Sequence, residues 1–218
     1  MTCQTPRGKI CKEKGQLMHM TAQRILHLSI GVGVAFGLPQ LALAHDGASL
    51  PYGSFIGGVT HPVLGLDHFL AMVSVGILSA QIGGRAIWTV PATFVSVMAF
   101  GGLLGFVDVG LTAIEAGISI SVLALGVAIA ADRRLPISLA MAAVGFFAIF
   151  HGYAHGAEMP TVANSVTYAA GFLAGTAALH LFGLLIGDIA RRNVHGNIVL
   201  RLTGGLIAGT GTFFLVGK

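Results

Sequence analysis

Charged side chains are scarce in this sequence, where Asp, Glu, Lys and Arg together make up 9% of 218 residues. A soluble domain carries about 25% charged residues, so this chain lacks the charge to cover a water-facing surface. Hydrophobic residues reach 55% and gather in long runs. A helix of about 20 apolar residues crosses the core of a bilayer. The composition therefore predicts an all-α fold, a polytopic bundle of membrane helices in contact with lipid.

Cysteine is nearly absent, because Cys3 and Cys11 are the only two and both lie close to the N-terminus. If that region is removed, the rest of the chain has no disulfide and no thiolate metal site. The sequence also lacks a phosphate-binding GxxxxGK[ST] loop and a GxSxG nucleophile motif. The net charge of +4 comes from basic residues near the N-terminus and in short loops, which does not indicate nucleic-acid binding.

The N-terminal region has the three parts of a secretory signal peptide. Residues 1–24 are polar and basic, residues 25–38 form an apolar run, and an Ala-Leu-Ala site ends at Ala44. This order predicts cleavage between Ala44 and His45, which divides the chain into a signal peptide (1–44) and a membrane domain (45–218). An uncleaved membrane anchor is the alternative, and Met18 or Met20 is an alternative start. After cleavage, the free amine of His45 and the adjacent Asp46 would form a site for a divalent metal outside the cytoplasm.

Six membrane spans follow from the apolar runs of the mature chain, and short connections make neighbouring helices antiparallel. The predicted spans cover residues 55–80, 86–107, 112–131, 136–154, 163–187 and 198–216.

The charges of the loops predict the orientation. With the mature N-terminus in the periplasm, the loops that face the cytoplasm carry arginines, whereas the opposite loops carry Asp108 and Glu158 and no Lys or Arg. This is the positive-inside pattern of a bacterial inner-membrane protein. The cytoplasmic arginines are Arg85, Arg133, Arg134, Arg191 and Arg192.

Ionisable side chains inside the spans form two groups, the first in the run HPVLGLDH of span one. On a helix, His61 and His68 would lie within roughly 20° of each other, two turns apart, with Asp67 about 100° away on the flank. Pro62 and Gly65 favour a kink or an unwound turn, which would bring these groups closer together. Imidazole and carboxylate ligands suit nickel, cobalt, zinc or iron.

The second group lies in the run FHGYAHGAE at the end of span four. His151, His155 and Glu158 stand at positions i, i+4 and i+7, so they project from one face of a helix. Two histidines and one carboxylate on one stripe are a suitable metal-binding face. A lone histidine in an apolar helix is more often a packing residue than a ligand. His180 in span five is therefore assigned either to the metal path or to a contact with a neighbouring helix.

The two runs together resemble the signature motifs of the HupE/UreJ family of nickel and cobalt permeases, HPxxGxDH and FHGxAHGxE. The resemblance extends to the signal peptide, the His45-Asp46 start and the six-span layout. It implies secondary transport of Ni²⁺ or Co²⁺ into the cytoplasm for hydrogenase or urease maturation or cobalamin synthesis, with no prosthetic group and no catalysis. By the motif match, the metal pathway would comprise His61, Asp67, His68, His151, His155 and Glu158.

Two other functions fit the same residues. An intramembrane metal-dependent hydrolase would use two histidines and a carboxylate to activate water, with Glu158 as its base. A metal-binding accessory protein would pass the ion to a membrane partner. Metal uptake by cells separates both alternatives from a permease.

Overall fold

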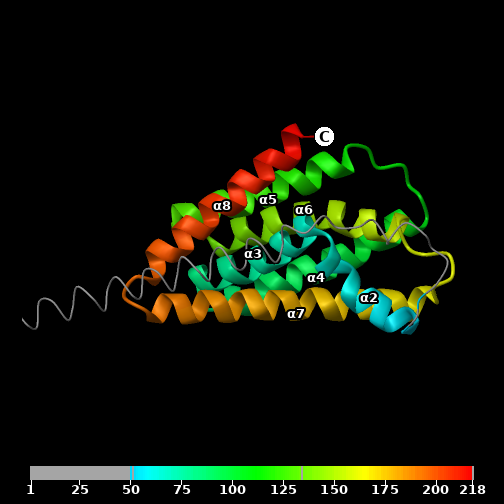
Figure 1. Ribbon diagram of the computed structural model, residues 1–218, viewed down its shortest axis with the longest axis horizontal. Helices are drawn as coiled ribbons and strands as arrows, with labels where there is room; N and C mark the ends of the chain where they lie inside the picture. Colours follow the sequence, from blue (N-terminus) through cyan, green and yellow to red (C-terminus); the bar gives the residue numbers. More distant parts are fainter. Residues whose placement is uncertain (1–49, 51, 134, 218) are drawn as a thin grey trace, which may run out of the picture. The chain divides into compact units, whose positions relative to one another are not determined.

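The structure is a computed structural model, and it describes residues 50, 52–133 and 135–217. All regular secondary structure in these ranges is α-helical, which confirms the predicted fold class (Figure 1). The predicted signal peptide, its cleavage site and the metal-binding pair His45 and Asp46 lie outside the described residues. The helices are α2 (Gly53–Leu64), α3 (Leu66–Ile82), α4 (Ala86–Phe106), α5 (Ile114–Ala131), α6 (Ile137–Ala157), α7 (Ser165–Arg192) and α8 (Gly196–Val216).

The described helices match the predicted membrane spans. Helices α4 to α8 are each long and apolar enough to cross a bilayer, and α2 and α3 pass the same test as a pair. The largest difference in bounds is at the end of α7, which continues from the predicted residue 187 to Arg192. An ion pair between Arg192 and Asp188, one turn earlier, accompanies this last turn.

The first span is broken rather than continuous, because α2 and α3 meet at an angle of 85°. Gly65 separates them with an extended backbone (φ −86°, ψ 116°). Pro62 lies inside α2, three residues before the break, and has no backbone N–H to donate within that helix. A Cβ atom at Gly65 would approach the Asp67 carboxylate and the His68 ring to 3.2 Å. Because glycine has no Cβ atom, Gly65 leaves room for the side chains of Asp67 and His68.

Helix α3 occupies the centre of the bundle. All ten of its residues from 71 to 80 are buried, and the helix contacts every other described helix. The break thus leaves α2 at the periphery against α7 and directs α3 into the core (Figure 1).

Glycines let several pairs of helices approach at backbone distance. A Cβ atom at Gly152 or Gly156 of α6 would overlap backbone carbonyls of α4, and one at Gly183 of α7 would overlap the Val73 carbonyl of α3. The pair α5 and α8 meets in the same way at Gly126. Small residues of this kind are what membrane helices use for close packing.

Two glycines of α8 do not take part in helix packing. Gly205 and Gly209 have the four-residue spacing that is typical of packing faces, but neither has an atom near its Cβ position among the described residues. Helix α8 packs instead through Gly204 and Gly211, which face Ala130 and Leu123 of α5.

The two ends of the bundle differ in charge. We call the end with the connections 83–85, 132–136 and 193–195 the arginine end, and the end with the connections 107–113 and 158–164 the acidic end. At the arginine end, Arg191 donates a hydrogen bond to the carbonyl of Ala80 at the end of α3, and Arg201 Nε donates one to the Ala130 carbonyl at 3.1 Å. Both contacts satisfy carbonyls in the last turn of a helix.

Candidate metal site

Four histidines from the two sequence motifs meet inside the bundle, although the motifs lie 90 positions apart. Ring centroids are 4.8 Å apart for His61 and His155, 4.2 Å for His68 and His155, and 4.9 Å for His68 and His151. We call these four residues the histidine cluster. Helix α2 contributes His61, α3 contributes His68 in its first turn, and α6 contributes the other two. His61 and His68 lie on either side of the break at Gly65, and the rings of both contact His155.

The carboxylate Glu158 joins one side of this cluster. Ligand atoms of His61, His155 and Glu158 all lie within 4.8 Å of one another. Glu158 is the first residue after α6 and is exposed, whereas His155 is buried. The predicted stripe on span four therefore extends from the interior of the bundle to the exposed residue that follows α6.

Asp67 determines the orientation of His68. Its Oδ1 atom lies 2.8 Å from His68 Nδ1 and also accepts a hydrogen bond from the His68 backbone at 2.8 Å. A carboxylate accepts a proton, so Nδ1 carries the hydrogen and Nε2 keeps its lone pair. His68 Nε2 is buried and has no hydrogen-bond partner in the described part of the chain. This carboxylate–histidine arrangement is typical of metal ligands.

Ser121 of α5 has the corresponding effect on His151. The Ser121 hydroxyl donates its hydrogen to the Ile118 carbonyl at 2.7 Å and lies 2.8 Å from His151 Nε2. Since the hydroxyl hydrogen is already used, His151 Nε2–H is the donor of the second bond. The lone pair of His151 is then on Nδ1, a buried atom for which residues 50, 52–133 and 135–217 supply no hydrogen-bond partner.

His155 lies at the centre of the cluster and touches both His61 and His68. It is 6% exposed, and neither of its ring nitrogens has a hydrogen-bond partner among the described residues. A buried polar atom without a partner costs about 1–3 kcal/mol. Four such nitrogens, on His68, His151 and His155, therefore make a costly arrangement that a divalent cation would relieve.

Aromatic side chains surround the histidines, and the motifs did not identify them. The Tyr168 hydroxyl lies 2.8 Å from His61 Nδ1, and Phe172, one turn later on α7, has its ring 4.1 Å from that of His155. Phe94 of α4 contacts His151 at 5.6 Å. Their spacing along the chain resembles that of ordinary core residues, so the sequence contained no signal for them or for Ser121.

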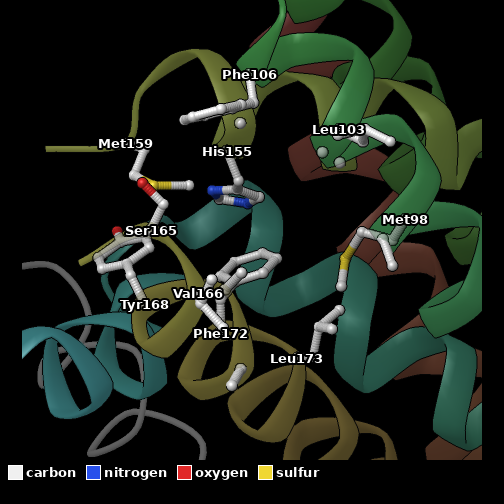
Figure 2. A pocket seen from close by; sticks show the side chains of 16 residues that line it. Met98, Leu103, Phe106, His155, Met159, Ser165, Val166, Tyr168, Phe172 and Leu173 are labelled. Carbon is white, nitrogen blue, oxygen red and sulfur yellow. The ribbon is translucent and has the colours of Figure 1, made fainter. Parts of the chain in front are cut away.

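A cavity of about 460 Å³ reaches the cluster from the side of α4, α6 and α7. Figure 2 shows His155 projecting into it between Met159 and Phe172. A second cavity, of about 510 Å³, lies at the acidic end and has Asp108 in its lining. The two cavities share the lining residues Phe106, Gly156, Met159 and Ser165. The second cavity is therefore adjacent to the one that His155 lines.

His180 of α7 is separate from the cluster. It is 2% exposed and makes a ring contact with Phe94 rather than with any of the four histidines.

The fold and the site define a polytopic helical membrane protein with a buried group of histidines at a broken first span. The chain belongs to the HupE/UreJ family, since the family model described as HupE / UreJ protein matches residues 33–214. Protein HupE of Rhizobium leguminosarum bv. viciae is 43% identical over 183 residues, which cover 84% of this chain and 94% of that protein. No solved structure matches the chain. The resemblance inferred from the two motifs is thus confirmed.

Proposed function

We propose that this protein is a permease that carries Ni²⁺ or Co²⁺ across the bacterial inner membrane into the cytoplasm. The observation that supports this most directly is the convergence of the histidine cluster, with four unpaired nitrogens, in the middle of a membrane bundle. The family membership agrees with it. The imported metal would serve hydrogenase or urease maturation or cobalamin synthesis.

Physical chemistry favours a metal path over a purely structural cluster. A divalent ion does not enter hydrocarbon unless protein ligands replace its water, and neutral imidazoles are suitable replacements. A structural role would instead pair each nitrogen with a donor or acceptor. In transport, binding must also remain weak enough for release.

The path we propose begins at the acidic end, which the distribution of arginines assigns to the periplasm. His45 and Asp46 of the mature N-terminus would capture the ion. Glu158, which lines a further cavity together with Glu115, would then receive it and pass it to His155.

Within the cluster, the ligands are the four histidines. Asp67 acts through His68, because its carboxylate already holds the Nδ1–H of that ring. Ser121 acts through His151 in the same way. We therefore assign Asp67 to positioning a ligand rather than to direct coordination in the cluster.

Uptake of radiolabelled nickel and cobalt by cells that express the chain tests the proposal. Wild-type cells should accumulate one or both metals, and His68→Ala cells should not, at equal amounts of protein in the membrane. His195→Ala, which removes an exposed histidine at the arginine end, is the matched control and should leave uptake unchanged.

Other outcomes would identify the alternatives. Equal uptake by wild-type and His68→Ala cells would contradict the assignment of the cluster. Metal binding by the purified protein without uptake would indicate an accessory protein. Zinc-dependent turnover of a lipid or peptide would indicate a hydrolase.

A further inference from the structure

His180 is a second place where buried imidazole nitrogens lack partners. Its side chain is 2% exposed, and both ring nitrogens are without a hydrogen-bond partner among the residues that the structure describes. The backbone there is tightly held, since a Cβ atom at Gly76 of α3 would overlap the His180 carbonyl. A leucine would occupy such a position at lower cost, because it has no polar atom to satisfy.

His180 continues the face of α7 that borders the histidine cluster. Tyr168, Phe172, Thr176 and His180 follow one another at intervals of four residues, and all four are buried. The first two contact histidines of the cluster. With a rise of about 1.5 Å per residue, His180 lies roughly 12 Å beyond Phe172 toward the arginine end.

One aromatic ring separates His180 from the cluster. Phe94 is fully buried, and its ring centroid is 5.6 Å from that of His151 and 5.2 Å from that of His180, the latter at 90° between the planes. Phe94 is therefore the ring that lies between the imidazoles of His151 and His180.

We propose that His180 is an inner metal-binding site, which receives the divalent cation from the histidine cluster past Phe94 before release at the arginine end. This rests on the proposed transport function. A neutral ring nitrogen supplies one ligand, and the Thr176 hydroxyl, one turn away on the same face, supplies an oxygen. Water supplies the remaining ligands, which keeps binding weak enough for the ion to leave.

Two further buried polar atoms lie on α3, whose Gly76 packs against the His180 backbone. Ser74 Oγ and Gln81 Oε1 of α3 are buried and unpaired within the described ranges, and they lie seven positions apart on one face of the helix. The Gln81 amide nitrogen is 3.3 Å from Asp132 at the arginine end. These oxygen atoms provide a sequence of ligands from the interior to the cytoplasmic face that the charge pattern predicts.

The test compares cobalt transport with cobalt binding in the same variants. The full-length protein is reconstituted into liposomes for cobalt uptake, and a purified sample is titrated with Co²⁺ while its visible absorption is recorded. His180→Leu should keep the spectrum and affinity of the histidine cluster and should not lower Tm, but its uptake should fall by roughly tenfold or more. His180→Gln, which retains a ligand oxygen, should recover part of the rate. His195→Ala should match the wild type in every assay.

Three results would overturn the inference. Wild-type uptake by His180→Leu would show that the ion does not use His180. Loss of both cobalt binding and uptake would make His180 a part of the histidine cluster rather than a separate site. If His180→Leu lost uptake and also had a lower Tm, His180 would be a packing residue and not a metal ligand. If the proposed transport function is itself wrong, liposomes that contain the wild-type protein will take up no cobalt.

Discussion

Asp67 Oδ1 lies 2.8 Å from His68 Nδ1, directly after the break that separates α2 from α3. The contact leaves His68 Nε2 as the nitrogen with a free lone pair, inside the bundle and within one ring contact of both His151 and His155. Asp67, in the first turn of α3, thereby determines which ring nitrogen of His68 is available to a metal ion.

Replacing Asp67 should weaken metal binding without removing a ligand. Asp67→Asn keeps an oxygen that accepts the Nδ1–H bond but loses the negative charge, so His68 becomes a poorer ligand. We expect metal affinity to fall about 10- to 100-fold, the usual effect of losing such a partner. Isothermal titration of the purified protein with Ni²⁺ measures it. Asp188→Asn, at the exposed end of α7, is the control, and equal affinities in the two variants would refute the positioning role.

Ser121 gives a similar prediction for His151. Ser121→Ala removes the acceptor of the His151 Nε2–H bond, leaving the tautomer undetermined and a buried N–H unpaired. We expect a loss of roughly tenfold in metal affinity. Ser119→Ala is a matched control, because Ser119 is equally buried on the same helix but donates only to the backbone carbonyl of Glu115. A similar loss in both variants would point to a general weakening of α5 instead.

The close approach of α6 and α4 should be sensitive to a single methyl group. In Gly156→Ala the new Cβ atom would overlap the Gly102 carbonyl, so the helices must separate. We expect a loss of about 1–3 kcal/mol in the free energy of unfolding, and weaker metal binding because α6 carries His151 and His155. Unfolding in mixed detergent measures the first effect. Gly205→Ala, whose Cβ would meet open space on α8, should not lower the free energy of unfolding, and an equal loss there would contradict the packing argument.

Gly65 should be needed for the break itself. Gly65→Ala favours a continuous helix by roughly 1 kcal/mol in propensity and crowds Asp67 and His68 at 3.2 Å. Straightening the span would move His61 away from His155, so metal binding should fall while the protein still inserts into the membrane. A distance measurement between spin labels at the ends of α2 and α3 reports the angle directly. A variant that keeps both the wild-type distance and wild-type metal affinity would show that glycine is dispensable there.

Much of the fold followed from local features of the chain. The lengths of the apolar runs predicted the spans, because each span must cover a bilayer of fixed thickness. The HPVLGLDH run predicted an interruption, because proline and glycine disfavour a continuous helix whatever surrounds them. The proposed signal peptide and the role of His45 and Asp46 remain predictions, since they concern residues that the structure does not describe.

The neighbours of each helix depended on the whole molecule. The spacing of Gly205 and Gly209 is as regular as that of Gly183 and Gly187, but only the second pair lies against another helix. A sequence repeat marks a smooth helix face and cannot say whether another helix covers it. For the same reason, the sequence did not indicate that Ser121, Tyr168 and Phe94 contact the histidines. These contacts form between helices that are distant in sequence.

The sequence by itself determined the class of protein, the positions of the apolar helices and the two histidine motifs, because these depend on hydrophobic length and on residue types at short spacing. Only the tertiary structure decided that the motifs meet, which nitrogens keep free lone pairs, and that His180 faces the cluster across Phe94. Those features depend on the bend at Gly65 and on the backbone contact of α6 with α4, where distant segments are brought within a few ångströms of each other.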